Sequence, residues 1–261
     1  MPRFAANLSF LFTELQFLDR FKAARNAGFD AVEFMFPYSY EKQQLAEVLK
    51  VNNLELVLHN LPAGNWEAGE RGIACHPNRR KDFQEGVQQA VDYAKALGCR
   101  KINCLAGIRP PGIEVAEARE TLINNLAWAA QILSGASIQL LLEPVNTVDT
   151  PGFFVSTSAF GLELINATDP AKIGLQFDVY HAQIMEGDLA RTIESNLKQI
   201  FHIQIAENPG RHEPGTGEIN YPFLFAFLDR IGYQGWIGCE YKPSGDTLSS
   251  LGWLKDARSY H

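Results

Sequence analysis

The chain alternates between short apolar runs and longer stretches in which apolar residues return at helical spacing. The clearest run covers residues 138–142. It ends at Glu143, and Pro144 follows, which has no backbone N–H and cannot continue a strand ladder. A short run of this kind predicts a strand that is buried on both faces of a parallel sheet. The carboxylate of Glu143 is therefore predicted at the carboxyl end of that strand.

The same pattern returns three times further along the chain. One apolar run ends in Asp178, one ends near Gln204, and one ends in Glu240. Each gap between these polar residues is long enough for a loop, a helix and the next strand. Four successive strands would then present their polar ends at one place.

Taken over the whole chain, the pattern predicts eight strand-and-helix units without a linker between two halves. The fold class is therefore α/β, a parallel (β/α)8 TIM barrel, and we expect residues 1–261 to form a single domain. The expected strands cover residues 4–7, 31–34, 54–59, 101–105, 138–143, 173–178, 202–206 and 236–240. The expected helices cover residues 13–27, 45–51, 83–97, 114–133, 157–167, 188–197, 221–229 and 247–255.

Composition narrows the possible partners. The net charge is −7, and Lys and Arg form no long run, which argues against nucleic acid or an anionic membrane as a partner. No apolar run reaches the ~18 residues of a membrane span, and the first residues lack a signal-peptide core. The four cysteines form no C-x-x-C pair, which is typical of reduced thiols in a cytoplasmic protein. We expect a cytoplasmic protein with a small-molecule partner. The sequence does not decide whether the protein is a monomer or a homo-oligomer.

The four polar strand ends have the chemistry of a metal site. Glu143, Asp178, Gln204 and Glu240 offer three carboxylates and one amide oxygen, which would repel one another without a cation. Hard oxygen donors suit Mg²⁺, with Mn²⁺ as the alternative, better than Zn²⁺. Any one of these acids alone could equally be a solvated or ion-paired strand end.

Further polar residues are candidates for binding a substrate. His59 ends the expected third strand and His181 follows Asp178, so each could hydrogen-bond a substrate oxygen or be a structural histidine. Arg211 lies on a Gly- and Pro-rich loop, where its guanidinium could bind a substrate carboxylate. Glu70, Arg71 and Gly72 lie on the long loop over residues 61–80 and could form a lid element. Lys101 and Lys242 are alternative cations for the substrate carboxylate.

Several stretches resemble hydroxypyruvate isomerase and 2-oxotetronate isomerase, a family within the xylose isomerase-like barrels. They are residues 3–9 (RFAANLS), 32–38 (VEFMFPY), 59–64 (HNLPAG), 68–74 (AGERGIA), 213–221 (EPGTGEINY) and 238–243 (GCEYKP). The resemblance implies metal ligation by Glu143, Asp178, Gln204 and Glu240, with Glu143 and Glu240 as the acid/base pair. Related sugar 3-epimerases have a histidine ligand where this chain has Gln204.

The resemblance implies aldose–ketose isomerisation of a small hydroxy-keto acid, with hydroxypyruvate as the expected substrate and 2-oxotetronate as the alternative. The opening of the chain is similar to the oxotetronate branch, whereas residues 59–62 and 143–146 are similar to the hydroxypyruvate branch. More distant alternatives are a ketose 3-epimerase, a metal-dependent hydrolase on the same barrel, and a sugar-acid binding protein without catalysis.

Overall fold

Eight parallel strands form a closed barrel in the computed structural model, which describes residues 2–257. The first residue and the last four residues of the expected domain lie outside this range. The strands follow the chain order around the barrel and are β1 (Arg3–Asn7), β2 (Ala31–Glu33), β3 (Glu55–Asn60), β4 (Lys101–Leu105), β5 (Gln139–Glu143), β6 (Ile173–Asp178), β7 (Ile200–Ile205) and β8 (Trp236–Cys239). The predicted fold class is confirmed.

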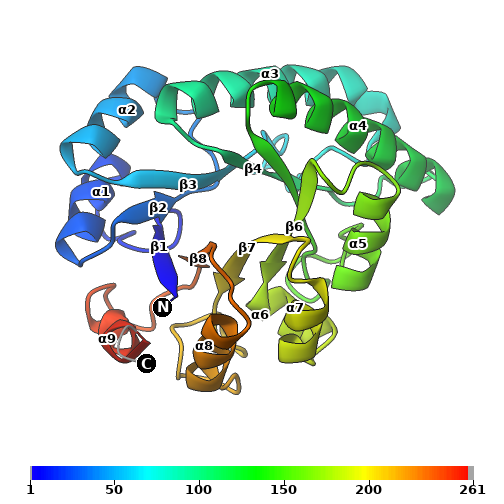
Figure 1. Cartoon of the computed structure of the whole chain (residues 1–261). Helices are drawn as coiled ribbons and strands as arrows, with labels where there is room; N and C mark the ends of the chain where they lie inside the picture. Colours follow the sequence, from blue (N-terminus) through cyan, green and yellow to red (C-terminus); the bar gives the residue numbers. More distant parts are fainter. Residues whose placement is uncertain (1, 258–261) are drawn as a thin grey trace.

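The helices form a layer outside the strands (Figure 1). They are α1 (Phe17–Asn26), α2 (Lys42–Val51), α3 (Arg80–Leu97), α4 (Val115–Gly135), α5 (Ser158–Asn166), α6 (Val179–Met185), α7 (Leu189–Asn196), α8 (Tyr221–Arg230) and α9 (Gly252–Ala257), with single 3-10 turns η1 (Pro77–Arg79) and η2 (Ser249–Leu251). None of the described helices is long and apolar enough to cross a bilayer.

Helix α3 shows why these sequences fold as they do. Phe83, Val87, Ala90 and Ala94 recur at helical spacing, and all four are buried against the barrel. Gly98 ends the helix with φ 69°, a left-handed conformation that glycine adopts without steric cost. The stripe predicted from the sequence is therefore the buried face of the helix.

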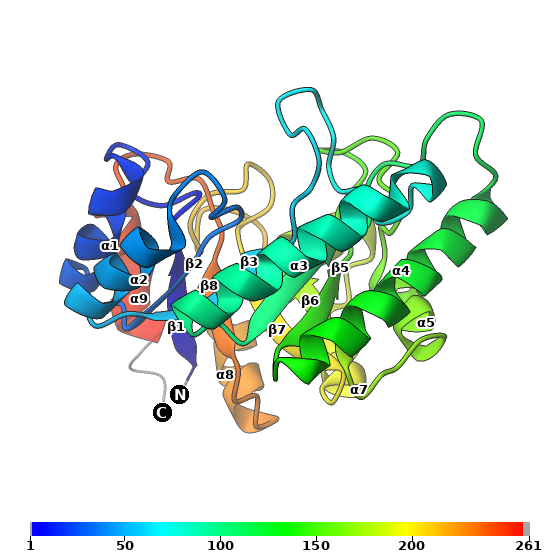
Figure 2. The ribbon, with the colours of Figure 1, turned by 90° about the horizontal axis from the view of Figure 1, so that it is seen from above.

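The barrel closes between the first and last strands. Arg3 of β1 pairs with Trp236 of β8, and Ala6 pairs with Cys239. Away from the carboxyl ends of the strands, the barrel interior is filled by small and branched side chains, including Ala5, Ala31 and Leu141. Polar side chains replace them toward the carboxyl ends of the strands, where the long loops also project (Figure 2).

Some elements differ from the prediction. Helix α1 begins at Phe17 rather than at residue 13, because residues 8–15 form turns and Leu15 is 39% exposed. Helix α6 was not expected. It begins directly after β6, and the Asp178 side chain caps it by accepting from the backbone N–H groups of Tyr180 (2.8 Å) and His181 (3.4 Å).

Candidate active site

A cavity of about 180 Å³ opens at the carboxyl ends of the strands. Glu143, His181, Arg211 and Glu240 are among its polar lining residues. Its remaining lining residues are Phe10, Met35, Asn60, Trp66, Arg71, Leu105, Val145, Asp149, Thr150 and Phe153. A small, partly apolar cavity with a few convergent charged groups is typical of a site for a small molecule.

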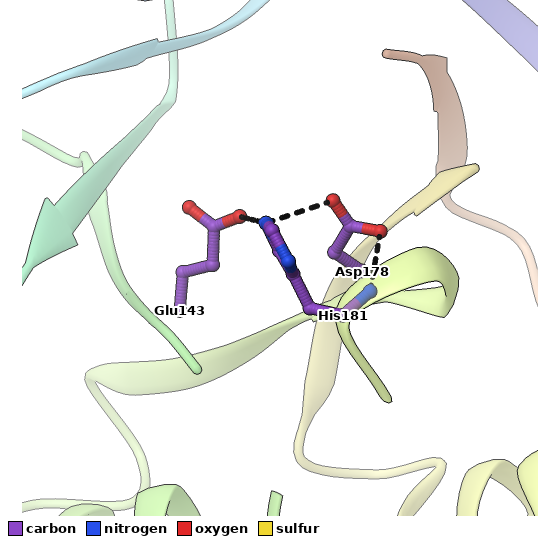
Figure 3. A group of neighbouring side chains, drawn as sticks. All are labelled: Glu143, Asp178 and His181. Carbon is purple, nitrogen blue, oxygen red and sulfur yellow. Dashed lines mark hydrogen bonds and ion pairs between the residues drawn. The ribbon is translucent and has the colours of Figure 1, made fainter. Parts of the chain in front are cut away.

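Two of the predicted carboxylates converge on His181 (Figure 3). Glu143 and Asp178 are the last residues of β5 and β6, and both side chains are buried. The Nε2 atom of His181 lies 3.6 Å from Asp178 Oδ2 and 4.0 Å from Glu143 Oε1. Candidate ligand atoms of these three residues lie within 4.8 Å of one another, a spacing that could hold a metal ion.

The hydrogen bonds of Asn146 fix the tautomer of His181. Asn146 Oδ1 accepts from the backbone N–H groups of Val148 (3.0 Å) and Asp149 (2.7 Å), which sets the orientation of the amide. Its Nδ2 therefore donates to His181 Nδ1 at 2.6 Å. Nδ1 then accepts, and the proton of the neutral ring is on Nε2, pointing toward the two carboxylates. In this state His181 is a hydrogen-bond donor to the cavity rather than a metal ligand.

Glu240 follows β8 directly and is held by three donors. Asn7 Nδ2 donates to Oε2 at 2.8 Å, Gln204 Nε2 donates to the same oxygen at 2.6 Å, and Arg211 donates to Oε1 at 2.5 Å. Burial raises the pKa of Glu240 well above its ordinary value, and Glu143, Asp178 and Glu33 add to the shift against the effect of Arg211. Burial, followed by repulsion from Asp178, also raises the pKa of Glu143.

Arg211 supplies positive charge to this acidic cluster. Its Nη2 lies 2.5 Å from Glu240 Oε1 and 3.6 Å from Asp178 Oδ2, and the guanidinium also lies over the Phe10 and Tyr180 rings. Burial opposes the charge of Arg211, but Glu240, Asp178 and Glu143 outweigh it and hold its pKa above the ordinary value. The side chain thus reaches the site from the loop after β7, as predicted.

The residues present fit a divalent cation. Three buried carboxylates meet at one place, and burial together with their mutual repulsion raises the pKa of Glu143 and Glu240. Asp178 Oδ2 is buried without a hydrogen-bond partner among residues 2–257. Carboxylate oxygens in this arrangement are the donors that Mg²⁺ or Mn²⁺ prefers.

Gln204 is turned differently from the prediction. Its Nε2 donates to Glu240 and to Glu33, and its Oε1 accepts from Gln176 Nε2 at 2.6 Å. The amide therefore presents N–H rather than oxygen to the neighbouring carboxylates. It would offer its oxygen to a cation only after rotation of the amide.

Two predicted substrate-binding residues lie away from this cavity. Lys101 is the first residue of β4, at the opposite end of the barrel from Glu143, and its Nζ donates to the Phe201 carbonyl at 2.5 Å. His59 is buried beside Tyr38 and does not line the cavity, whereas the next residue, Asn60, does. Burial lowers the pKa of His59 to about 4.

Glu70 belongs to the loop after β3 but does not line the cavity. Its carboxylate accepts from Arg79 at 2.6 Å and from the backbone N–H of Asn65, and these two bonds help to lower its pKa. Glu70 therefore supports the structure of the loop, and its role in substrate binding stays a prediction.

Residues that the sequence analysis did not select also shape the site. Glu33, at the end of β2, is fully buried and accepts from Asn7 (3.0 Å), Gln204 (2.8 Å) and His202 (2.7 Å). It extends so far into the barrel that a Cβ on Gly238 would come within 2.2 Å of its carboxylate. The signal that could have found Glu33 is the one used for Glu143, an acid at the end of an apolar run.

The chain belongs to the xylose isomerase-like TIM barrel family, whose model matches residues 21–257. Among individual proteins, it is 50% identical to hydroxypyruvate isomerase of Escherichia coli (strain K12) over 99% of this chain and 100% of the relative. It is 46% identical to 2-oxo-tetronate isomerase of Cupriavidus necator, with 98% of each chain covered. The predicted family and the isomerase class are thereby confirmed.

A solved structure has nearly the same backbone. The crystal structure described as AP endonuclease, family 2, from Brucella melitensis has a TM-score of 0.95 and 46% identity, over 98% of this chain and 99% of that chain. An L-ribulose 3-epimerase structure matches with a TM-score of 0.81 at 23% identity, which shows a shared fold alone.

Proposed function

We propose that this protein interconverts hydroxypyruvate and tartronate semialdehyde through an enediolate. The observation that carries the proposal is the pair of buried carboxylates, Glu143 and Glu240, lining one small cavity beside the donor His181. The reaction moves a proton between adjacent carbons and another between their oxygens. It needs a base, an acid and a means to stabilise negative charge on oxygen.

In the proposed mechanism Glu143 and Glu240 exchange protons with the substrate carbons and oxygens. The Nε2–H of His181 would donate to a substrate oxygen as negative charge develops there. A divalent cation, Mg²⁺ or Mn²⁺, would be held by Glu143, Asp178 and Glu240, with Gln204 after rotation of its amide. When bound, the cation supplies Lewis-acid stabilisation of the oxygens and lowers the pKa values of the glutamates. Arg211 would stay paired with Glu240 and hold that carboxylate in place.

The proposal is tested by proton NMR of the protein with Mg²⁺ and hydroxypyruvate in D₂O. We expect tartronate semialdehyde to form, with deuterium entering the product carbon when the transferred proton exchanges with solvent. Glu143→Gln and Glu240→Gln should each lose most of kcat while the fold persists, because general acid–base groups typically contribute ~10²–10⁴-fold. Turnover by either variant above about a tenth of the parent rate would contradict the two-glutamate scheme.

The metal site has its own test. Asp178→Asn should weaken Mg²⁺ binding measured by calorimetry, because an amide does not supply the negative charge of the carboxylate. Asp188→Asn, at an exposed residue before α7, is the matched control and should bind Mg²⁺ like the parent. Equal Mg²⁺ affinity in the Asp178 variant and the parent would refute this ligand set.

The names of two relatives suggest other activities, and each can be tested. The 46% identity to 2-oxo-tetronate isomerase supports the same reaction on a substrate longer by one carbon, and kcat/KM for the two acids decides between them. The similarity to the protein described as an AP endonuclease makes endonuclease activity a second alternative to be tested. The net charge of −7 argues against a DNA backbone as the partner. Incubation with an abasic duplex and Mg²⁺ should leave the DNA intact.

A further inference from the structure

The loop between β3 and η1, residues 61–76, carries a second arginine to the cavity. We call it the β3 loop, and it rises above the strand ends (Figure 2, cyan). Two of its side chains, Trp66 and Arg71, line the cavity that Glu143 and Glu240 also line. The β3 loop therefore forms one wall of the proposed active site.

The β3 loop is held in shape by its own contacts. The Glu70 carboxylate accepts from Arg79 at 2.6 Å and from the backbone of Asn65. Gly72 N donates to the Ala63 carbonyl at 2.9 Å, which closes the base of the loop. Because these bonds fix the backbone on both sides of Trp66, the side chains that reach the cavity have a defined place.

Arg71 is oriented but not neutralised. Its guanidinium lies over the Trp66 ring, 4.2 Å from the centroid, and Nη1 donates to the carbonyls of Trp66 (2.9 Å) and Glu70 (2.8 Å). Both bonds use one nitrogen, so Nη2 and Nε stay available as a fork of donors. No acidic side chain among residues 2–257 forms an ion pair with Arg71.

Arg211 differs from Arg71 in this respect. It pairs with Glu240 and lies near Asp178, so its charge is already used by the acidic cluster. A carboxylate that came to Arg211 would meet these two negative charges at close range. The same carboxylate at Arg71 would meet a guanidinium that has no acid of its own.

We infer that Arg71 binds the carboxylate of the substrate and so restricts this site to small 2-oxo acids and their hydroxy-aldehyde isomers. The inference rests on the proposed function. A guanidinium fork matches a carboxylate with two parallel N–H···O bonds, which gives orientation as well as affinity. With its carboxylate at the β3 loop, the substrate directs its reacting carbons toward Glu143 and Glu240 at the strand ends.

Kinetics of Arg71→Gln test the inference. Because the carboxylate keeps its charge throughout the reaction, its contact stabilises the bound substrate and the transition state alike. We expect KM for hydroxypyruvate to rise ten- to a hundredfold, the range for a lost charged hydrogen bond, while kcat stays within threefold of the parent. Arg71→Lys keeps the charge without the fork, so its KM should lie between those of the parent and Arg71→Gln. Arg80→Gln, at the exposed start of α3, is the control and should behave like the parent.

A binding measurement makes the inference independent of turnover. D-Glycerate, a three-carbon hydroxy acid, is titrated by calorimetry into the parent, Arg71→Gln and Arg80→Gln. Affinity at least tenfold weaker in the Arg71 variant alone supports the inference. Equal affinity in all three, or a Gln variant that loses kcat with KM unchanged, overturns it. If the parent binds D-glycerate through Arg71 but does not isomerise hydroxypyruvate, the proposed function fails and the carboxylate site stands.

Discussion

The two nitrogens of the His181 ring have different tasks in this structure. Nδ1 accepts from Asn146 and Nε2–H faces Glu143 and Asp178, so a residue outside the acidic cluster determines which atom can donate to a substrate. The amide of Asn146 is itself fixed by two backbone N–H groups. The donor in the cavity therefore depends on a chain of hydrogen bonds that begins in a turn of the backbone.

Asn146→Asp changes the tautomer of His181 with almost no change of shape. The new carboxylate accepts rather than donates, so Nδ1 takes a proton and Nε2 loses its own or the ring becomes charged. We expect kcat to fall about 10- to 100-fold, the range for a bond that orients a histidine in a site. The ¹⁵N NMR shifts of the His181 ring report the tautomer directly. Unchanged shifts in the variant would contradict this assignment.

The alternation of side chains along a strand explains why some candidate residues were found from the sequence and others were not. Glu143 and Asp178 were predictable because each is an acid that directly follows an apolar run, and each is the last residue of a buried strand. The third strand runs one residue further than expected, to Asn60, and the interior side chain at its end is Asn60 rather than His59. Neighbouring residues of a strand face opposite sides, so an error of one residue exchanges the two faces.

The other differences between the prediction and the structure have physical causes as well. Lys101 begins its strand, and the rule that selected Glu143 would have excluded it, because only carboxyl ends meet at the cavity. Helix α6 has seven residues, too few for a clear periodic pattern. The contacts of Arg71 with Trp66 arise from a loop conformation that has no periodicity to read.

At the level of the β3 loop, Gly72 fixes how closely the loop approaches β4. Its φ is 114°, and a Cβ there would lie 2.3 Å from the Leu105 carbonyl oxygen, whereas a Cβ on Gly69 (φ 93°) would meet nothing within 4 Å. Both alanine variants take the ~1–2 kcal/mol cost of a left-handed residue, and only Gly72→Ala adds a clash of ~1–3 kcal/mol. Urea unfolding should show Gly72→Ala to be the less stable. Equal stability of the two would mean that the loop moves away freely.

At the scale of the whole molecule, the low pKa of buried His59 should make the folded protein less stable in mild acid. Its pKa is about 4 in the folded protein, because of burial, against ~6.5 in an unfolded chain. Between these values the unfolded chain binds a proton that the folded protein does not, so the free energy of unfolding falls as the pH decreases from 6.5 toward 4. From pH 7 to pH 5 this amounts to on the order of 2 kcal/mol.

Comparison with His59→Asn isolates this contribution from that of the acidic cluster. The variant lacks the titrating ring. When the pH is lowered from 7 to 5, the free energy of unfolding of the parent should therefore fall by on the order of 2 kcal/mol more than that of the variant. Urea unfolding at the two pH values measures it. A difference that is constant with pH would contradict the depressed pKa of His59.

The closure of the barrel by β1 and β8 also sets an order of events during protein synthesis. Asn7, from the first strand, donates to Glu240, which follows the last strand, so the two residues meet only after nearly the whole chain has left the ribosome. Until then β1 lacks one neighbour, and the cavity lacks one of its two proposed proton-transfer groups. A chain that ends before Glu240 lacks both this carboxylate and its hydrogen bond with Asn7. The capacity for turnover therefore arises together with the closed fold.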